Sequence, residues 1–150
     1  MPNAATIMIV NGPNLNLLGV RQPDIYGTET LGDIEAACAE RSATLGLECD
    51  FRQTNHEGEI VSWTHEARSN HDGIIINAGA YSHTSIAILD ALRACDLPVV
   101  EVHMTNIHSR ESFRHHSYIS LAATGMICGF GSQGYLLALD AVARLIAEKE

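Results

Sequence analysis

The segment "TIMIVNGPNLNLLG" (residues 6–19) joins a short apolar run to a loop rich in asparagine and glycine. A short run of apolar and β-branched residues bounded by turn residues predicts a buried strand. The loop contains three asparagines, two glycines and a proline between residues 11 and 19, a composition that neither helix nor strand favours. Since amide side chains at the end of a buried strand need polar partners, we predict that this loop forms one wall of a functional site.

The same pairing of a strand with a following segment recurs along the chain. Four more apolar runs predict strands, and five segments predict helices from their periodicity. The strands are 47–54, 73–79, 98–104 and 125–131, and the helices are 30–46, 59–70, 82–95, 109–117 and 132–150. Thr30 and Asp33 have the spacing of a capping box at the start of the first helix. Strict alternation predicts an α/β fold: a flavodoxin-like, doubly wound, five-stranded parallel sheet in a single domain spanning residues 1–150.

Composition narrows the classes of protein. The chain has 150 residues, 46% of them hydrophobic, and a formal net charge of −9, which argues against a nucleic-acid-binding protein. Four cysteines without a C-x-x-C pair indicate reduced thiols. With neither a signal-peptide pattern nor an apolar run of about 20 residues, we expect a cytoplasmic protein that does not contact membranes.

Polar residues concentrate where the predicted strands end. The segments after the strands carry Asn, His, Arg, Tyr and Ser, as in "NHEGE" and "TNIHSRESFR", whereas the opposite ends, such as "RACDLP", carry little beyond turn residues. Ligands of open α/β sheets bind outside the carboxyl ends of the strands. The sequence therefore predicts a site at that edge.

Glu101 and His103 are the first candidate pair. The two-residue period of a strand places them on one face. A carboxylate beside an imidazole fixes its tautomer and stabilises the imidazolium, as a general acid or base requires. The alternative is a structural pair satisfied by neighbouring backbone groups. We favour catalysis because a glutamate in a buried strand is costly without a partner.

Arg21 and Tyr26 form a second candidate pair. A tyrosine is a poor base at its ordinary pKa of about 10, but a nearby guanidinium favours the phenolate. The sequence does not place the two side chains in contact, and a surface arginine with a packing tyrosine is the simpler interpretation. Gly19 and Gly27 bracket the segment and suggest a movable lid.

"NAGAYSHTS" (77–85) ends one strand and opens a helix. Asn77 and His83 are candidates for binding a carboxylate or hydroxyls there, beside the N–H groups of the first helical turn. The alternative is a capping turn with Ser82 or Thr84 as N-cap, and both interpretations can hold together.

Arg110 and Arg114 are four residues apart and would share a helix face that clamps an anion; the alternative is pairing with Glu111 or solvation. Adjacent His115 and His116 point in different directions on a helix, and no H-x-x-x-H or cysteine-bearing ligand set occurs, so we expect no metal site.

"GFGSQG" (129–134) satisfies G-x-G-x-x-G. The chain ends before the second strand and acidic residue of a dinucleotide site, so its glycines are assigned to turning and helix packing.

Four blocks together resemble type II 3-dehydroquinate dehydratase: "NGPNLNLLGVRQPDIYG", "NAGAYSHTS", "EVHMTNIHSRESFRHHS" and "GFGSQGYLLAL". The resemblance covers nearly the whole chain in order and spacing. It implies a flavodoxin-like subunit, a homo-oligomer (a dodecamer built from trimers), and a small anionic substrate. It also implies cofactor-free, reversible dehydration of 3-dehydroquinate to 3-dehydroshikimate by trans elimination through an enolate.

The resemblance also implies residue roles. Tyr26 would be the base that removes the C2 proton, with Arg21 lowering its pKa. Asn14 would hold the water that stabilises the enolate oxygen. His103, oriented by Glu101, would protonate the departing hydroxyl. Substrate binding would fall to Asn77, His83, Met104, Thr105 and Arg114, with Arg110 as a lid or supporting residue and Asp90 reaching the site of a neighbouring subunit.

Departures from the family pattern are few. Met104-Thr105 replaces an aliphatic-serine pair, Gln22 stands where Glu is common, and Ser82 where Thr is common. Two rival classes are weaker. A flavin-binding module usually has a Ser- and Thr-rich phosphate loop after the first strand, where this chain has "NGPNLN". A receiver-like signalling domain requires a cluster of acidic residues at the strand ends, where this chain has basic and amide residues.

Overall fold

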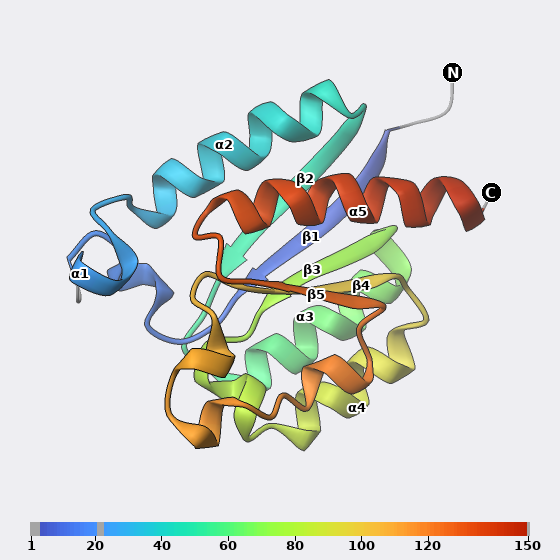
Figure 1. The fold of residues 1–150 in the computed structure, drawn as a ribbon. Helices are drawn as coiled ribbons and strands as arrows, with labels where there is room; N and C mark the ends of the chain where they lie inside the picture. The colour runs from blue at the N-terminus through green and yellow to red at the C-terminus, as the bar shows by residue number, and fades with distance from the viewer. Residues whose placement is uncertain (1–3, 21–22, 150) are drawn as a thin grey trace.

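The computed structural model describes residues 4–20 and 23–149. One sheet of five parallel strands runs through the molecule in the order β2-β1-β3-β4-β5 (Figure 1). The strands are β1 (Ala5–Asn11), β2 (Leu47–Gln53), β3 (Gly73–Asn77), β4 (Val99–His103) and β5 (Gly125–Cys128). The chain moves from β1 outward to β2 and returns to the other side of β1 as β3. This reversal confirms the predicted flavodoxin-like order and places the switch point between β1 and β3.

Two pairs of helices cover the sheet, one on each face (Figure 1). The four helices are α2 (Leu31–Thr44), α3 (Glu57–Asn70), α4 (Ile86–Cys95) and α5 (Gln133–Lys149). Ile7 and Ile9 of β1 pack against α2 and α5, whereas Met8 and Val10 pack against α3 and α4. Because successive strand residues face opposite layers, burying both faces requires the continuous apolar runs seen in the sequence.

Side-chain caps mark the starts of α2 and α4. Thr30 and Asp33 form the predicted capping box: the backbone N–H of Asp33 donates to the Thr30 hydroxyl at 3.1 Å, and the backbone N–H of Thr30 donates to the Asp33 carboxylate at 3.0 Å. The N-cap of α4 is Ser85, whose hydroxyl accepts from the N–H of Ile88 at 3.0 Å. The prediction of Ser82 or Thr84 as the cap was therefore wrong, because a 3-10 turn, η2 (Gly79–His83), comes first.

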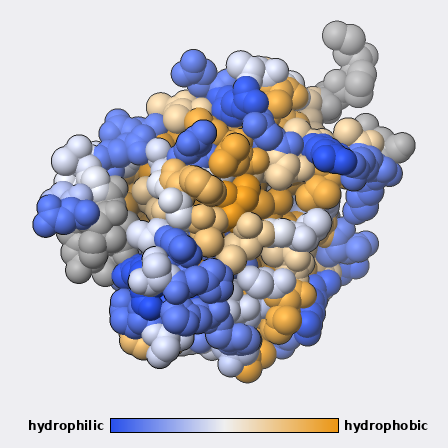
Figure 2. All heavy atoms as spheres, viewed as in Figure 1, coloured by the Kyte–Doolittle hydropathy of each residue, from blue (hydrophilic) through white to orange (hydrophobic). Residues whose placement is uncertain are grey.

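The predicted helix over 109–117 was also wrong. Two separate 3-10 turns, η3 (Ile107–Ser109) and η4 (Ser112–Arg114), lie here, and η5 (Ile119–Leu121) follows. The Asn106 side chain caps η3, and Arg110 then adopts an extended backbone that separates the two turns. Figure 2 shows hydrophilic side chains gathered over this segment, and apolar ones around β5 and α5.

Short helical segments also lie within the loop after β1. They are η1 (Leu15–Leu17) and α1 (Pro23–Tyr26). Gly19 and Gly27, which bracket α1, have φ of 88° and 80°, a conformation that favours glycine. Along the described chain, no helix combines the length and apolar character needed to cross a bilayer.

Candidate active site

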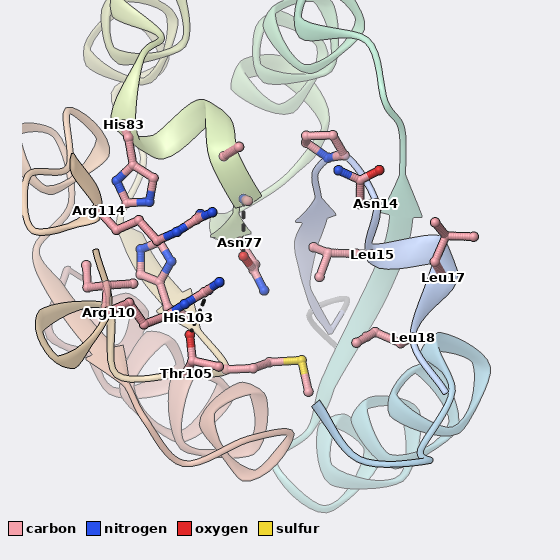
Figure 3. Close-up of a pocket in the computed structure, with 15 residues that line it drawn as sticks. Asn14, Leu15, Leu17, Leu18, Asn77, His83, His103, Thr105, Arg110 and Arg114 are labelled. Carbon is pink, nitrogen blue, oxygen red and sulfur yellow. Dashed lines mark hydrogen bonds between the residues drawn. The ribbon is translucent and has the colours of Figure 1, made fainter. Parts of the chain in front are cut away.

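The loops that follow β1, β3 and β4 enclose a cavity of about 180 Å³ at the carboxyl edge of the sheet (Figure 3). One wall comes from the loop after β1, including Asn14, and the facing wall carries His83, His103, Arg110 and Arg114. Drug-sized ligands occupy pockets from about 300 Å³ upward, so this space suits a smaller molecule. The lining residues are Pro13, Asn14, Leu15, Leu17, Leu18, Asn77, Gly79, Ala80, His83, His103, Met104, Thr105, Ile107, Arg110 and Arg114.

The sequence predicted that the segments after all five strands form a site at the carboxyl edge of the sheet, and three of the five line the cavity. The segments that follow β2 and β5 do not line the cavity. "GFGSQG" turns the chain through Gly129 and Gly131, at φ of 96° and 58°, and lets α5 approach β4 at Gly134, where a Cβ would lie 3.4 Å from Val102. This packing role is the one predicted for these glycines.

Glu101 and His103 point the same way from β4 and form a hydrogen bond. The Nε2–H of His103 donates to Oε2 of Glu101 at 2.5 Å, and both side chains are buried. Two serines complete the carboxylate's partners: Ser117 donates to Oε2 at 2.6 Å and Ser120 to Oε1 at 2.5 Å. Since Nε2 is occupied, Nδ1 is the atom that His103 can use toward a ligand.

Glu101 is ionised in this setting. Burial favours the neutral acid and is the largest single influence, but the hydrogen bonds from His103, Ser117 and Ser120 together hold the pKa of Glu101 below its ordinary value of 4.5. A buried carboxylate with three donors provides a fixed negative charge behind the imidazole. The carboxylate therefore fixes the orientation of the His103 ring at the cavity wall.

His83 stands against His103, with ring centroids 6.2 Å apart and planes within 20°. Its Nδ1 bonds the backbone carbonyl of His116 at 2.8 Å; because a carbonyl only accepts, Nδ1 carries the hydrogen. Burial lowers the pKa of His83 and the neighbouring His103 adds to this, although the bond to His116 opposes it. A neutral His83 offers Nε2 to a hydroxyl group in the cavity.

Asn14 and Asn77 approach the cavity from two strand ends that touch. The backbone N–H of Gly12 donates to the carbonyl of Asn77 at 2.8 Å, and a Cβ at Gly12 would lie 2.4 Å from the carbonyl oxygen of Ala78. Asn14 has a φ of 71°, in the left-handed region that asparagine tolerates, and its backbone N–H donates to the Asn55 side chain at 3.1 Å. The amide-rich loop thus folds against β3 and presents Asn14 to the cavity.

Both arginines also line the cavity, although they do not share a helix. Arg114 donates through Nε to Glu111 at 2.9 Å, and Arg110 donates through Nη1 to the Thr105 hydroxyl at 3.3 Å. Pairing with Glu111 was the alternative considered from the sequence, and it coexists with a place in the lining. Met104 and Thr105, which follow β4, lie in the lining as expected.

Three candidates are not among the lining residues that the structure describes. Asp90 is exposed on α4 and does not line it. Arg21 lies outside the described residues. The backbone of Tyr26 ends α1, but its side chain is likewise outside what the structure describes.

The structure adds four residues that the sequence interpretation missed: Asn11, Ser117, Ser120 and Tyr135. The serines hold Glu101, and Tyr135 joins Asn11 to Asn77. Their partners lie 16 to 124 residues away along the chain, so no local pattern signals them. The sequence signal that could have found two of them is a polar residue beside an apolar run, as at Asn11 and Tyr135, because buried polar groups need hydrogen-bond partners.

Asp50, Glu66 and His71 come close enough together to be considered as metal ligands. Arg52 already occupies this cluster: its Nη2 donates to Asp50 at 2.7 Å and also to Glu66. His71 donates to Asp50 at 2.9 Å. The guanidinium takes the position of a cation, so the cluster is an ion-pair network beside β2.

The carboxyl edge therefore combines an acid–base pair, amides and guanidinium groups around a small space. This arrangement places the chain among the α/β enzymes that act on small anionic molecules at the switch point of a parallel sheet. The family model described as dehydroquinase class II matches residues 5–143, and the chain belongs to this family.

Relatives and solved structures agree with this family. A protein of Streptomyces avermitilis named 3-dehydroquinate dehydratase is 66% identical over 142 residues, covering 94% of this chain and 89% of that protein. Its namesake in Methylobacterium radiotolerans is 58% identical, covering 95% of each. The crystal structure of type II dehydroquinase from Propionibacterium acnes matches with a TM-score of 0.91 and 44% identity, covering 96% of this chain and 99% of that one.

Proposed function

We propose that the chain catalyses the reversible dehydration of 3-dehydroquinate to 3-dehydroshikimate, a carbon–oxygen lyase reaction of the shikimate pathway. The observation that carries this function is the Glu101–His103 pair, 2.5 Å apart, on a small cavity with amides and arginines in a chain of the dehydroquinase family. The reaction removes a proton from C2 and a hydroxyl from C1. It needs a base, an acid and stabilisation of the intermediate enolate, all of which protein side chains can supply without a cofactor.

The base side belongs to the loop after β1. Tyr26 as phenolate would take the C2 proton, with Arg21 favouring the phenolate. The C2 electron pair moves toward the C3 carbonyl and gives an enolate, whose oxygen would be stabilised by a water held at Asn14. Support comes from position: this loop forms the wall opposite His103 (Figure 3). A trans elimination requires base and acid on opposite faces of the ring.

The acid side belongs to β4. His103 would donate its proton to the C1 hydroxyl as the enolate collapses, the C1–O bond breaks and water leaves. The fixed charge of Glu101 stabilises the imidazolium before this transfer and orients the ring. Because Nε2 is held by Glu101, the proton would come from Nδ1.

Substrate binding would use the remaining lining. Arg114 would pair with the substrate carboxylate, with backbone N–H groups around Met104 and Thr105 beside it, and Arg110 would support this wall. Asn77 and His83 would bind ring hydroxyls. All of these residues line one cavity, which supports a shared ligand.

The proposed assembly is a dodecamer built from trimers in the cytoplasm. Asp90 would complete the site of a neighbouring subunit. Its exposure on α4, away from the cavity of its own chain, is compatible with that role.

The test is turnover of 3-dehydroquinate in metal-free buffer, followed through the absorbance of the enone product. We expect turnover without added metal or cofactor. Tyr26→Phe should lower kcat by several orders of magnitude with substrate binding largely retained, because only the base is lost. Absence of turnover by the assembled wild-type chain would overturn the function, and near-normal kcat in Tyr26→Phe would overturn the phenolate base alone.

A further inference from the structure

A buried tyrosine hydroxyl lies directly behind the cavity and joins two asparagines. The Tyr135 hydroxyl donates to Oδ1 of Asn11 at 2.7 Å and accepts from Nδ2 of Asn77 at 2.9 Å. Tyr135 and Asn11 are 0% exposed and Asn77 is 4% exposed. Asn77 lines the cavity, whereas Tyr135 and Asn11 do not.

Backbone groups at both ends fix the direction of every hydrogen bond in this chain of side chains. At one end the carbonyl of Arg52, which only accepts, takes the Nδ2–H of Asn11 at 3.0 Å. Oδ1 of Asn11 must then face Tyr135 and accept the hydrogen of its hydroxyl. Because that hydrogen is used, the hydroxyl can only accept from Asn77, and the Asn77 atom facing it must be the donor Nδ2. At the other end the backbone N–H of Gly79, which only donates, meets Oδ1 of Asn77 at 3.2 Å (Figure 3). Both ends are consistent with one orientation of the Asn77 amide, in which Nδ2 faces Tyr135 and Oδ1 faces Gly79.

The Tyr135 hydroxyl keeps its proton in this position. Burial raises the pKa of the phenol above its ordinary value of 10, although the bond from Asn77 opposes the shift. Tyr135 is therefore a permanent donor to Asn11, and it cannot exchange its roles with Asn77 by ionising. The bond from Asn77 holds one of the two hydrogens on Nδ2, and the second is the one that Asn77 can offer to a ligand.

We propose that Tyr135 is a positioning residue: it locks the Asn77 amide so that an N–H, and not the carbonyl oxygen, serves an oxygen of the substrate. This role rests on the proposed function, in which Asn77 binds a ring hydroxyl. A rotated amide would present its oxygen to the cavity and leave its nitrogen facing the Gly79 N–H. The buried hydroxyl thereby selects ligands with an acceptor at this place.

The first test is Tyr135→Phe, which deletes the hydroxyl and keeps the ring. Asn77 is proposed to bind a ring hydroxyl and to move no proton, so its loss of orientation weakens ground state and transition state alike. We expect KM for 3-dehydroquinate to rise about tenfold and kcat to stay within about twofold of wild type. Asn11→Ala, which removes the acceptor that orients the hydroxyl, should raise KM in the same direction by about threefold.

Thr64→Val is the matched control. Thr64 is also 0% exposed, and its hydroxyl donates to the carbonyl of Ile60 at 2.9 Å within α3, outside the cavity. The substitution Thr64→Val removes one buried hydroxyl, as Tyr135→Phe does. We expect unchanged KM and kcat in this variant even if its thermal stability falls, which separates positioning from a merely structural contribution.

A double variant decides whether Tyr135 acts through Asn77. In an Asn77→Ala background, adding Tyr135→Phe should leave KM unchanged, because the group that Tyr135 orients is already absent. A wild-type KM in Tyr135→Phe, or a multiplied KM in the double variant, overturns the proposal. A neutron crystal structure of Tyr135→Phe, which distinguishes the amide nitrogen from the oxygen, gives a readout that does not need turnover: a rotated Asn77 amide supports the lock, and an unmoved one overturns it. If the wild-type chain lacked turnover, the proposed function would fail while this structure still decided the lock.

Discussion

Glu101 holds a charge inside the protein because three donors reach its two oxygens. One donor, the imidazole of His103, faces the cavity, so the carboxylate acts on the site only through that ring. The two serine hydroxyls occupy two further lone-pair sites and keep the carboxylate from turning away. This division predicts what happens when the charge is removed and the shape is kept.

Glu101→Gln should lower kcat by about 10- to 100-fold, and His103→Ala by more, because general-acid catalysis supplies about 10²- to 10⁴-fold and the orienting residue only part of it. The amide lacks the charge that stabilises the imidazolium, although its oxygen can still accept from the Nε2–H of His103. Steady-state kinetics measures this. Glu59→Gln is the matched control, since Glu59 bonds Thr54 at the start of α3, away from the cavity. An equal loss in the two variants would contradict the assignment of Glu101.

The same substitution should change the pH dependence of stability. The pKa of Glu101 is lower in the folded chain than the ordinary 4.5, so below 4.5 the unfolded chain binds more protons. The stabilisation is fully present above 4.5 and is lost as the pH falls through the lower folded value. One such proton gives a slope of up to about 1.4 kcal/mol per pH unit.

Urea unfolding below and above pH 4.5 checks this. Glu101→Gln should show the shallower dependence, because other carboxyls with lowered pKa, such as Asp50, remain in both chains and cancel in the difference. Parallel curves for the two chains would show that Glu101 does not contribute.

At the scale of elements, the strands were predictable and the short turns were not. β1 and β3 lie between the two layers of helices. Because both faces of these strands are buried, their sequences are continuous apolar runs, which are recognisable from the sequence alone. The turns η3 and η4 carry little such information, because polar residues of that segment suit a helix as well as a 3-10 turn. Their geometry depends on the Asn106 cap and the extended backbone at Arg110.

The candidate site divides in the same way. The period of β4 was enough to pair Glu101 with His103 from sequence. Nothing local could connect Tyr135 with Asn77, 58 residues away, because that contact exists only once α5 packs on the sheet.

Gly12 allows the loop after β1 to contact the loop after β3, because it has no side chain at the point of closest approach. Gly12→Ala would put a Cβ 2.4 Å from the carbonyl oxygen of Ala78, a backbone atom that cannot step aside alone. We expect a loss of about 1–3 kcal/mol in the free energy of unfolding, as for other overpacked positions. Turnover should also fall, because the shift separates Asn14 from Asn77. Chemical unfolding and the enone assay measure the two effects.

Gly58→Ala provides the contrast for Gly12→Ala. Gly58 lies in the first turn of α3, and its Cβ would meet nothing within 4 Å. Alanine there should raise stability by up to about 1 kcal/mol through helix propensity, with unchanged kinetics. A similar loss in both variants would mean that the close approach at Gly12 is not the cause.

At the scale of the whole molecule, a single chain leaves large apolar side chains in solvent. Ile86, Phe113, Leu121 and Phe130 are each more than half exposed. A contiguous patch of such side chains would mark an interaction face. Ile86 and Asp90 both lie on α4, one turn apart. Burial of this helix against a second copy is what would bring Asp90 to another chain's cavity.

The proposed sharing of sites predicts complementation between two impaired chains. Tyr26→Phe loses the base of its own site and keeps Asp90, whereas Asp90→Ala keeps the base and fails to complete its neighbour's site. Each homogeneous assembly should have low activity. In hybrids formed by co-expression, an Asp90→Ala chain beside a Tyr26→Phe chain has both groups, so random mixing restores about a quarter of the sites in a cyclic assembly. The enone assay on hybrids that light scattering shows to be assembled measures this recovery. Mixing the same two proteins without subunit exchange is the control. If hybrids showed only the average of the two parents, each site would be built from a single chain, and the exposed Asp90 would have no part in the chemistry.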